Sequence, residues 1–378
     1  MVSTTAAVET QFAEQFREFI NGESNAEMRK LREDAFAAFL LTGFPTPKDE
    51  DWKYTNVSKI SNLKFEISEP TVESEYFETL ERFNFRRNGF AALNLAFGDV
   101  EMIRIPKETS IHEPIELNFA AEDGKALFPH VIVVAEAGSK ATIVETYASE
   151  GTGYTNAAIQ IVVEDNANVT HYRVQKESPE AFQYGVTEVT LGRGSQYNST
   201  NINLGAALSR HDIDVKFTAE GGEAWVDGLY MLNGSQHHDT HSIIDHSVPN
   251  CLSHQTYKGV LNDHSRGVFN GKVFVRENAH GTDAQQSNKN LLLSNDARVD
   301  TKPQLEIFND DVKCSHGATV GQLEGEELFY LLTRGLPEPL AKNLLTYGFA
   351  EEVINKIGIE SIKTELDAMV LNRLGTEI

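Results

Sequence analysis

Apolar and polar residues alternate through the middle of the chain, and this alternation recurs at a fixed interval. The residues seven, five and three positions before Gly138 are Val131, Val133 and Ala135, and similar apolar series precede later markers of the same kind. Alternation with period two is typical of a β-strand, and glycine and asparagine tolerate the left-handed backbone of a tight turn. The markers are spaced by 28 residues: Gly138, Asn166, Gly194, Gly222, Asn250 and Asn278.

A repeat of this length with strands in every unit predicts a solenoid, because one unit cannot bury its inner face alone and stacks on its neighbours. There is no leucine-rich signature and no helical segment between the strands. We therefore predict a mainly β fold, a right-handed parallel β-helix, over residues 101–322. Gln160, Glu188 and Lys216 fall between the apolar positions and are expected to point outward.

The repeat leaves one alternative and one irregularity. A β-sandwich with evenly spaced turns gives the same local alternation, although five equal intervals favour the solenoid. The apolar series weakens in the fifth unit, where Ile243 is followed by Asp245 and Ser247. We expect the wall of the solenoid to be interrupted there.

The N-terminal region is predicted to be helical. The stretch ETQFAEQFREFI places Phe12 and Phe16 on one face and stops at Asn21-Gly22. A second helix is expected to begin at Ser24, with Glu27 at capping-box spacing, and to end at Gly43. The following loop, residues 44–60, carries Trp52 and Tyr54, for which local packing is favoured over a lid or an interface.

The C-terminal region is also predicted to be helical, in three or four short helices. Gly335, Gly348 and Gly358 stand where helices are expected to end. Such helices either close the end of the solenoid or form a docking module. The predicted organisation is a helical region at 1–60, a connecting region at 61–100, the β-helix at 101–322 and a helical region at 323–378.

The composition argues against a nucleic-acid-binding, membrane-spanning or disulfide-rich secreted protein. A net charge of −23 without a local basic stripe argues against nucleic acid as a partner. The sequence has no 18-residue apolar run, which argues against a membrane span, and its first residues lack the pattern of a signal peptide. Two cysteines in 378 residues form no disulfide framework. We therefore expect a cytoplasmic protein.

A histidine-rich segment, residues 235–264, is one candidate for chemistry. Imidazoles bind zinc, copper, iron or nickel, but no zinc-ligand spacing and no HExxH motif occur here. Histidines on turns and strands are favoured over a resident metal site, although a stand-alone β-helix metalloprotein stays as an alternative. The segment contains His237, His238, His241, His246, Cys251, His254 and His264.

Asp310 and Asp311 are a second candidate, because paired carboxylates act as acid and base in carbohydrate-cleaving enzymes. An exposed turn is the favoured interpretation, and a carbohydrate-active β-helix enzyme is the alternative. The sequence contains no GxxxxGK[ST] loop and no GxSxG nucleophile elbow. No nucleotide site is expected in this chain.

Cys314 and His316 are the third candidate. Alternate residues of a strand share a face, so the pair can present sulfur and nitrogen together to a soft or borderline metal. Two ligands do not complete a tetrahedral site, and the others must come from elsewhere, including another subunit. A cysteine that serves only as a small buried apolar residue is an equal alternative.

Three stretches resemble the SufB/SufD family, the scaffold subunits of the Suf iron–sulfur cluster assembly machinery. They are PKDEDWKYTNVSKI (47–60), the long segment from NLLLSNDARVDTKPQLEIF to CSHGATVGQLEGEELFYLLTRGL (290–336) and AKNLLTYGFAEEVINKI (341–357). The form of the CSHGATVGQL segment and the EDWKYT motif resemble the SufD branch of that family. The resemblance implies a β-helix flanked by helical regions.

The resemblance also implies a function. The chain is expected to be a non-enzymatic scaffold subunit that pairs with a SufB-like chain and binds the ABC-type ATPase SufC, which would carry the nucleotide. Cys314 and His316 would lie at the subunit interface and hold a transient iron–sulfur cluster shared with the partner. Pairing of two β-helices also leaves open a homodimer of this chain alone. Residues 324–348 would dock the ATPase, around Phe329, Tyr330, Arg334, Gly335 and Leu336.

Overall fold

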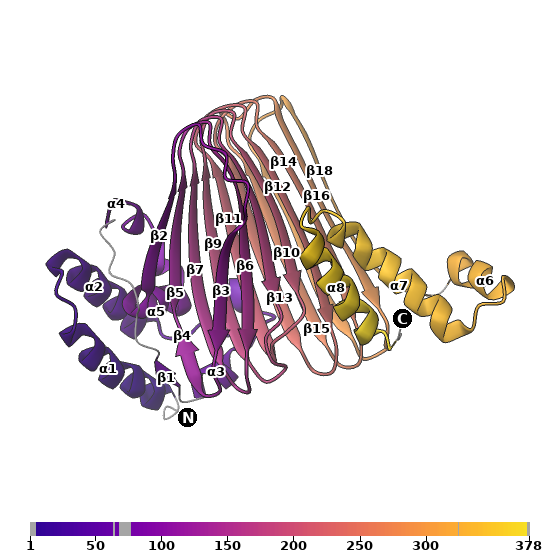
Figure 1. Cartoon of the computed structure of the whole chain (residues 1–378), viewed down its shortest axis with the longest axis horizontal. Coiled ribbons are helices and arrows are strands. Elements are labelled where there is room, and N and C mark those ends of the chain that lie inside the picture. The colour runs from indigo at the N-terminus through magenta and orange to yellow at the C-terminus, as the bar shows by residue number, and fades with distance from the viewer. Residues whose placement is uncertain (1–4, 63–64, 68–76, 324, 376–378) are drawn as a thin grey trace.

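The computed structural model describes residues 5–62, 65–67, 77–323 and 325–375, and it shows a parallel β-solenoid with helices at both ends of the chain (Figure 1). Every pairing between its named strands is parallel, and from β5 onward successive strands alternate between two sheets. The predicted mainly β, parallel β-helix fold is confirmed, and the antiparallel sandwich is wrong.

The two sheets form the opposite walls of the solenoid. The first sheet is 10-stranded. Its strands are β1 (Glu66–Ile67), β2 (Asp99–Ile105), β4 (Lys125–Leu127), β5 (Pro129–Ala135), β7 (Tyr154–Val163), β9 (Phe182–Leu191), β11 (Leu208–Phe217), β13 (His237–His246), β15 (Arg266–Val275) and β17 (Arg298–Ile307). The second sheet is 8-stranded. Its strands are β3 (Ile115–Ala121), β6 (Lys140–Ser149), β8 (Asn168–Gln175), β10 (Gln196–Asn203), β12 (Glu223–Leu232), β14 (Leu252–Leu261), β16 (Thr282–Leu292) and β18 (Val312–Gln322).

The left-handed turn residues follow the predicted repeat only in part. Gly138, Asn166, Gly194 and Asn250 have positive φ angles, as predicted. Gly222 and Asn278 do not, and Gly221 and Gly281 take that conformation instead. These left-handed residues are therefore 27 to 31 residues apart rather than strictly periodic.

The irregular fifth unit has a specific cause. The turns after β11 and β13 are longer than the earlier ones, so that the last inward residue stands four rather than three positions before the left-handed residue, as His246 does before Asn250. In β13 the inward residues are consequently Ile244 and His246, both buried, whereas Ile243 points outward and is 36% exposed. The predicted inward positions Asp245 and Ser247 were wrong for the same reason, since a shift by one residue exchanges the two faces of a strand.

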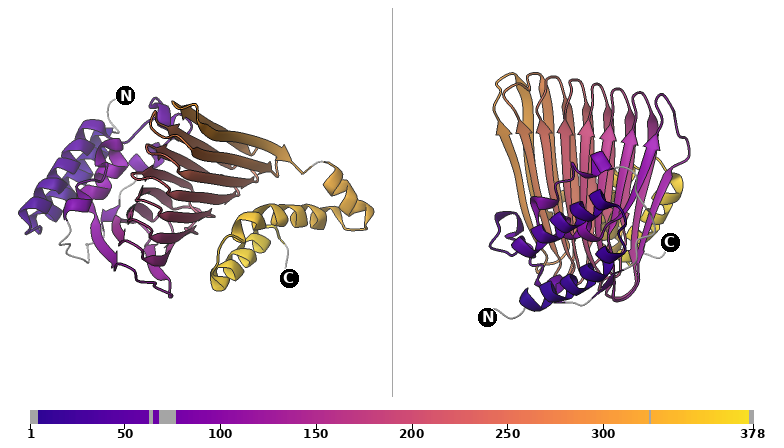
Figure 2. Two further views of the ribbon diagram at one scale, coloured as in Figure 1. Left: turned by 90° about the horizontal axis from the view of Figure 1, so that it is seen from above. Right: turned by 90° about the vertical axis from the view of Figure 1, so that its left-hand side faces the viewer.

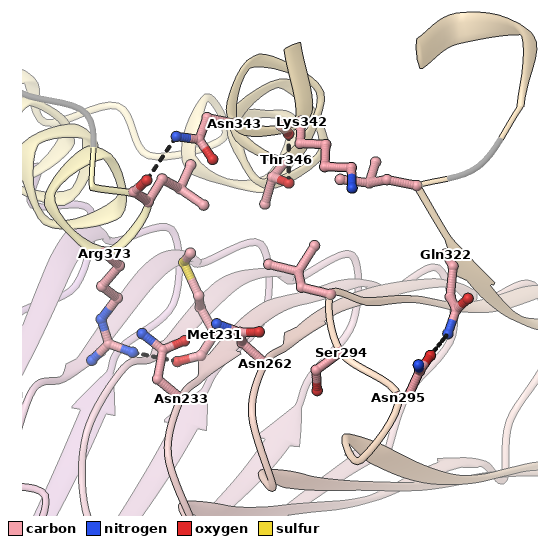
Figure 3. Close-up of a pocket in the computed structure, with 13 residues that line it drawn as sticks. Met231, Asn233, Asn262, Ser294, Asn295, Gln322, Lys342, Asn343, Thr346 and Arg373 are labelled. Atoms are coloured by element: carbon pink, nitrogen blue, oxygen red, sulfur yellow. Dashed lines mark hydrogen bonds between the residues drawn. The ribbon is translucent and has the colours of Figure 1, made fainter. Parts of the chain in front are cut away.

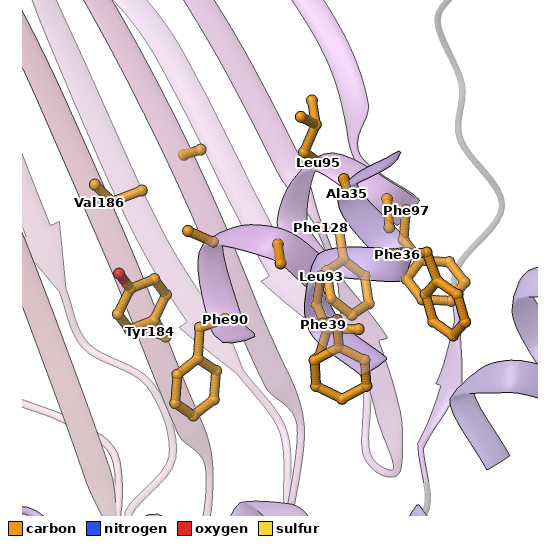
Figure 4. Close-up of a cluster of buried hydrophobic side chains, with 14 of the residues drawn as sticks. Ala35, Phe36, Phe39, Phe90, Leu93, Leu95, Phe97, Phe128, Tyr184 and Val186 are labelled. Carbon is orange, nitrogen blue, oxygen red and sulfur yellow. The ribbon is translucent and has the colours of Figure 1, made fainter. Parts of the chain in front are cut away.

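The N-terminal helices cover the outer side of the first sheet at its N-terminal end (Figures 1 and 4). Phe97 lies at the centre of this cluster, with its ring near those of Phe16 and Phe36, and Phe90 stacks on Tyr184 of β9. The helical segments are α1 (Thr5–Asn21), α2 (Ala26–Thr42), η1 (Glu50–Trp52), α3 (Ser58–Asn62), α4 (Phe77–Leu80), η2 (Phe85–Arg87) and α5 (Gly89–Phe97).

This cover changes what the outward positions contact. Gln160 points outward as predicted but is buried, with its Oε1 atom 3.0 Å from Nε2 of His130.

At the start of α2, the side chain of Asn25 accepts the capping hydrogen bonds, so the prediction of Ser24 was wrong. Trp52 is buried and stacks on Phe90, which confirms local packing.

The C-terminal helices lie beside the outer face of the second sheet and leave its last strand uncovered (Figures 1 and 2). They are α6 (Glu326–Thr333), α7 (Glu338–Ile354) and α8 (Glu360–Arg373). Gly335 follows α6 with a φ of 88°, as predicted, whereas Gly348 lies inside α7 and ends no helix. None of the described helices is long and apolar enough to cross a membrane.

Candidate functional site

The last turn of the solenoid, formed by β17 and β18, is open. Each of these strands pairs with one neighbour, and no other strand of the described part of the chain pairs with its second edge. Most residues of β18 are exposed, unlike those of the inner strands. An unpaired edge presents a row of backbone donors and acceptors that another chain can pair with.

Apolar side chains surround this open turn. Ile307 is 41% exposed, Phe308 is 56% exposed and Val320 is 50% exposed. These residues were not predicted from the sequence, although the adjacent apolar pair Ile307-Phe308 breaks the alternation at the end of β17 and could have indicated them. Apolar residues beside an unpaired strand edge are the features of a protein-binding surface.

Cys314 lies on the inward side of β18, at the mouth of the solenoid. It pairs in register with the buried Ala284 of β16 and packs against the interior apolar cluster. The residue is half-buried, and this partial burial raises the pKa of its thiol. In the isolated chain the thiol is therefore protonated at neutral pH and is a poor nucleophile.

His316 lies two residues further along the same face. It pairs in register with Gln286 of β16, which points into the interior, and its own side chain is exposed. The strand thus carries a sulfur atom and an imidazole on one side of the open turn. The described residues contain no group of three or more histidine, cysteine, aspartate or glutamate side chains that is suited to hold a metal ion.

The histidine-rich segment is distributed over several environments. His237 faces Thr55 on the outer side of the first sheet, and His241 contacts Asp239 there. His238 and His246 lie inside the solenoid and contact serine hydroxyls.

The remaining members of the segment are further apart. His254 stacks on Trp225 on the outer face of the second sheet, and His264 faces Asp296 in a turn. Cys251 is buried beside backbone carbonyls. The segment therefore supplies separate structural contacts.

Asp310 and Asp311 lie in the turn between β17 and β18. Both residues are exposed, and the backbone carbonyl of Asp311 accepts a hydrogen bond from the amide of Gly281. The interpretation of this pair as an exposed turn is confirmed. It lies at the rim of the open end, close in sequence to Cys314.

The predicted docking residues lie on and after α6, which projects away from the solenoid (Figures 1 and 2). This helix has no buried residue; Phe329 is 67% exposed and Tyr330 is 55% exposed. The guanidinium of Arg334 lies 5.0 Å from the ring centroid of Tyr330. Leu332, Leu340 and Leu344 add exposed apolar area on α6 and α7. Gly335 and the half-buried Leu336 form the turn between these helices.

Helix α7 is attached to the solenoid through its C-terminal half, whereas α8 is held by several contacts, including that of Arg373 with the backbone carbonyl of Met231. Ala350, Val353 and Ile354 at the end of α7 are buried against the second sheet. The Lys258 ammonium donates to the backbone carbonyl of Phe349 at 3.0 Å, which ties α7 to β14. The first half of α7 is not packed in this way.

A pocket of about 410 Å³ separates the first half of α7 from the turns of the solenoid (Figure 3). Its lining is rich in amides, including Asn233, Asn262 and Asn343, and the hydrogen bond between Gln322 and Asn295 closes one side. The pocket shows that α6 and the start of α7 form an arm whose base is fixed and whose tip is free of the sheet.

Comparison with known proteins identifies the family. The family model "SUF system FeS cluster assembly, SufBD core domain" matches residues 118–349, more than half of the chain, and the model "SufBD protein N-terminal region" matches residues 6–83.

Individual relatives agree with these matches. The iron–sulfur cluster assembly protein SufD of Escherichia coli is 30% identical over 383 residues, covering 89% of this chain and 90% of that protein. An iron–sulfur cluster assembly SufBD family protein of Synechocystis is 38% identical over 291 residues, which span 73% of this chain and only 64% of that relative. The chloroplastic protein ABCI7 of Arabidopsis thaliana is 29% identical over 94% of this chain and 88% of its own length. The chain therefore belongs to the SufBD family of iron–sulfur cluster assembly proteins.

Proposed function

We propose that this chain is a non-catalytic scaffold subunit that assembles iron–sulfur clusters together with a SufB-like chain and the ATPase SufC. The observation that carries the proposal is the open last turn, where Cys314 and His316 offer two ligands beside an unpaired strand edge. A partner that pairs with this edge would bring the missing ligands. The cluster is the cargo of this site, held transiently between the two subunits.

The partner at the open end is a second β-solenoid. The edges of β17 and β18 offer backbone groups in the spacing of a parallel sheet, and Ile307, Phe308 and Val320 supply apolar contacts around them. A SufB-like chain of the same fold offers a complementary edge. Two copies of this chain are the alternative pairing when the SufB-like chain is absent.

The arm, formed by α6 and the start of α7, is the proposed binding site for the ATPase. Phe329 and Tyr330 project from a helix that contributes nothing to the solenoid core, and exposed aromatic residues are favoured anchors in interfaces. Because the base of α7 is fixed to the second sheet, movement of the arm would be transmitted to β12 and β14. ATP binding can favour one arrangement of the open end only if the ATPase binds that arrangement more tightly.

Anaerobic affinity capture of the tagged full-length chain from its own cell lysate tests the partners. We expect mass spectrometry to identify an ABC-type ATPase and a larger paralogue. The double variant Phe329→Glu/Tyr330→Glu is expected to lose the ATPase and to keep the paralogue. Leu41→Glu, at a position 86% exposed on α2, is the matched control and should keep both.

Surface variants are preferable to removal of all the C-terminal helices, because α7 and α8 cover apolar residues of the second sheet that truncation would expose. The paralogue is expected to be lost from a Val320→Asp variant that keeps the ATPase. Capture of the unaltered chain without an ATPase or a paralogue would contradict the proposal. In the purified complex, His316→Ala is expected to abolish cluster retention without releasing either partner.

A further inference from the structure

The side-chain oxygen of Gln286 is an unusual atom beneath the open turn. Gln286 is 3% exposed, and among the described residues its Oε1 atom has no hydrogen-bond partner. Its Nε2 atom donates to Oε1 of Gln255 at 2.7 Å, and Nε2 of Gln255 donates to Oγ of Ser242 at 2.8 Å. A buried acceptor without a donor is unfavourable, so a donor is to be expected.

The donor is indicated by the register of the last two strands. Gln286 on β16 is paired with His316 on β18. Paired residues of neighbouring parallel strands lie about 4.8 Å apart and point to the same face. His316 therefore stands directly above Gln286 in the same interior row, within reach of its oxygen.

Gln286 is also held in place from the opposite wall. A Cβ atom on Gly271 of β15 would lie 2.3 Å from Nε2 of Gln286, so the glutamine packs directly against the backbone of the first sheet. The row above Gly271 continues with Pro303 of β17. The amide is thus enclosed on the side of the first sheet and by Gln255 below, and the neighbouring strand on the side of its buried, unpaired oxygen that remains to be considered is β18.

We propose that Gln286 is a positioning residue for His316. Its Oε1 atom accepts a hydrogen bond from one ring nitrogen of His316 when the open turn is covered by the partner subunit. A neutral imidazole has one N–H and one lone pair, so this bond leaves the other nitrogen free to bind iron. In histidines that bind metals, the N–H of the other ring nitrogen ordinarily donates to an oxygen, such as that of a carboxylate or a backbone carbonyl. This inference rests on the proposed function, in which His316 is a ligand of the transient cluster.

A double-mutant cycle on the cluster-free, partner-bound complex tests the proposal, with anaerobic iron(II) titration as the measurement. Gln286→Met, which keeps the volume and removes the acceptor, is expected to weaken iron(II) binding about 10- to 100-fold. Gln286→Glu keeps an acceptor oxygen and is expected to bind within a few-fold of the unaltered complex. In a His316→Ala background, Gln286→Met is expected to have no further effect, because its action passes through His316.

The control is Asn288→Leu, which removes a buried amide from the next inward position of the same strand. It is expected to lower thermal stability as much as Gln286→Met and to leave iron(II) binding unchanged. Equal loss of iron binding in the control, or the same loss with and without His316, would assign Gln286 a merely structural role and overturn the proposal.

A spectroscopic measurement reads the hydrogen bond itself. In a sedimented complex in which only this chain carries ring-¹⁵N histidine, Gln286→Met should shift the His316 nitrogen signals, which a His316→Ala sample identifies. Unchanged signals would overturn the proposal. If His316→Ala does not weaken iron(II) binding, the proposed function fails. If His316→Ala weakens it and Gln286→Met does not, only the role of Gln286 fails.

Discussion

The guanidinium of Arg210 lies over the indole of Trp52, 3.7 Å from the ring centroid, and joins the 44–60 loop to the first sheet. Arg210 also donates to Asp212 at 2.8 Å and to Asp239 at 3.1 Å. Burial alone would raise the pKa of Asp239, but His241 and Arg210 together lower it. Arg210 is thus the cation that these two buried carboxylates share beneath the loop, and its charge favours the ionised form of both.

Replacement of Arg210 by methionine is expected to destabilise the protein by about 3–5 kcal/mol, because it leaves buried carboxylates without their cation. The measurement is urea unfolding followed by Trp52 fluorescence in a Trp225→Phe background. Arg210→Lys keeps the charge and loses the planar guanidinium. Its free energy of unfolding should lie between those of the parent protein and of Arg210→Met. An Arg210→Met protein as stable as its parent would show that the loop is held by the ring contacts alone.

Glu177 is expected to make stability depend on pH. Burial raises the pKa of Glu177 to about 7, against hydrogen bonds from Thr155 and Gln175 that lower it. Between the ordinary value of 4.5 and pH 7, the folded state therefore binds more protons than the unfolded state. The free energy of unfolding falls across this window as pH rises, by on the order of 3 kcal/mol from this group.

A Glu177→Gln protein lacks this contribution. Its stability relative to the parent protein is expected to improve steadily as pH rises from about 4.5 to about 7 and to change little above that range. Urea unfolding of both proteins at several pH values measures the difference. A constant difference across the window would show that Glu177 ionises in the folded protein as it does in the unfolded chain.

Gly228 is expected to be intolerant of even one added methyl group. A Cβ atom there would lie 2.1 Å from the ring of Tyr257, which is fully buried and packs on Phe269. Gly228→Ala should cost about 1–3 kcal/mol in urea unfolding. Gly348→Ala is the control, because a Cβ at that position of α7 meets no atom within 4 Å. The control should gain about 0.5–1 kcal/mol from improved helix propensity.

Cys314 is expected to react slowly with iodoacetamide at neutral pH in the isolated chain, because partial burial raises the pKa of its thiol. The buried Cys251, whose thiol pKa is also raised by burial, should react more slowly still. Mass spectrometry over time measures both rates, and the unfolded chain in urea gives the reference. Binding of the partner subunit should slow the reaction of Cys314 further. Rapid labelling of Cys314 in the free chain would contradict this description of its environment.

The repeat could be predicted from the sequence because inward residues and left-handed turns are local requirements. Gly138, Asn166 and Gly194 satisfy them at equal spacing. The later drift to Gly221 and Gly281 could not be predicted, because turn length is tolerated freely wherever the next strand still reaches its register. The burial of Gln160 depends on helices more than 60 residues away in sequence, which local alternation does not reveal.

Gly348 shows the same limit in the C-terminal region. Glycine within a helix costs about 1 kcal/mol relative to alanine, which is why Gly348 was predicted to end a helix. The helix continues because Ala350 and Val353, just beyond the glycine, are buried against the second sheet. At the candidate site, the strand position of Cys314 and His316 could be predicted from alternation. The orphan oxygen of Gln286 could not, since it depends on contacts between three strands.

The open last turn makes the two ends of the solenoid different. Figures 1 and 2 place α1 and α2 at the opposite end of the solenoid from β18. When two solenoids pair through their open last turns, the free edges of β17 and β18 in both chains become paired. The N-terminal helices then lie at the two outer ends of the pair. The edges of β17 and β18 are then no longer available to a third chain. Such a pairing would prevent a fold that stacks parallel strands, as amyloid fibrils do, from extending at its open end.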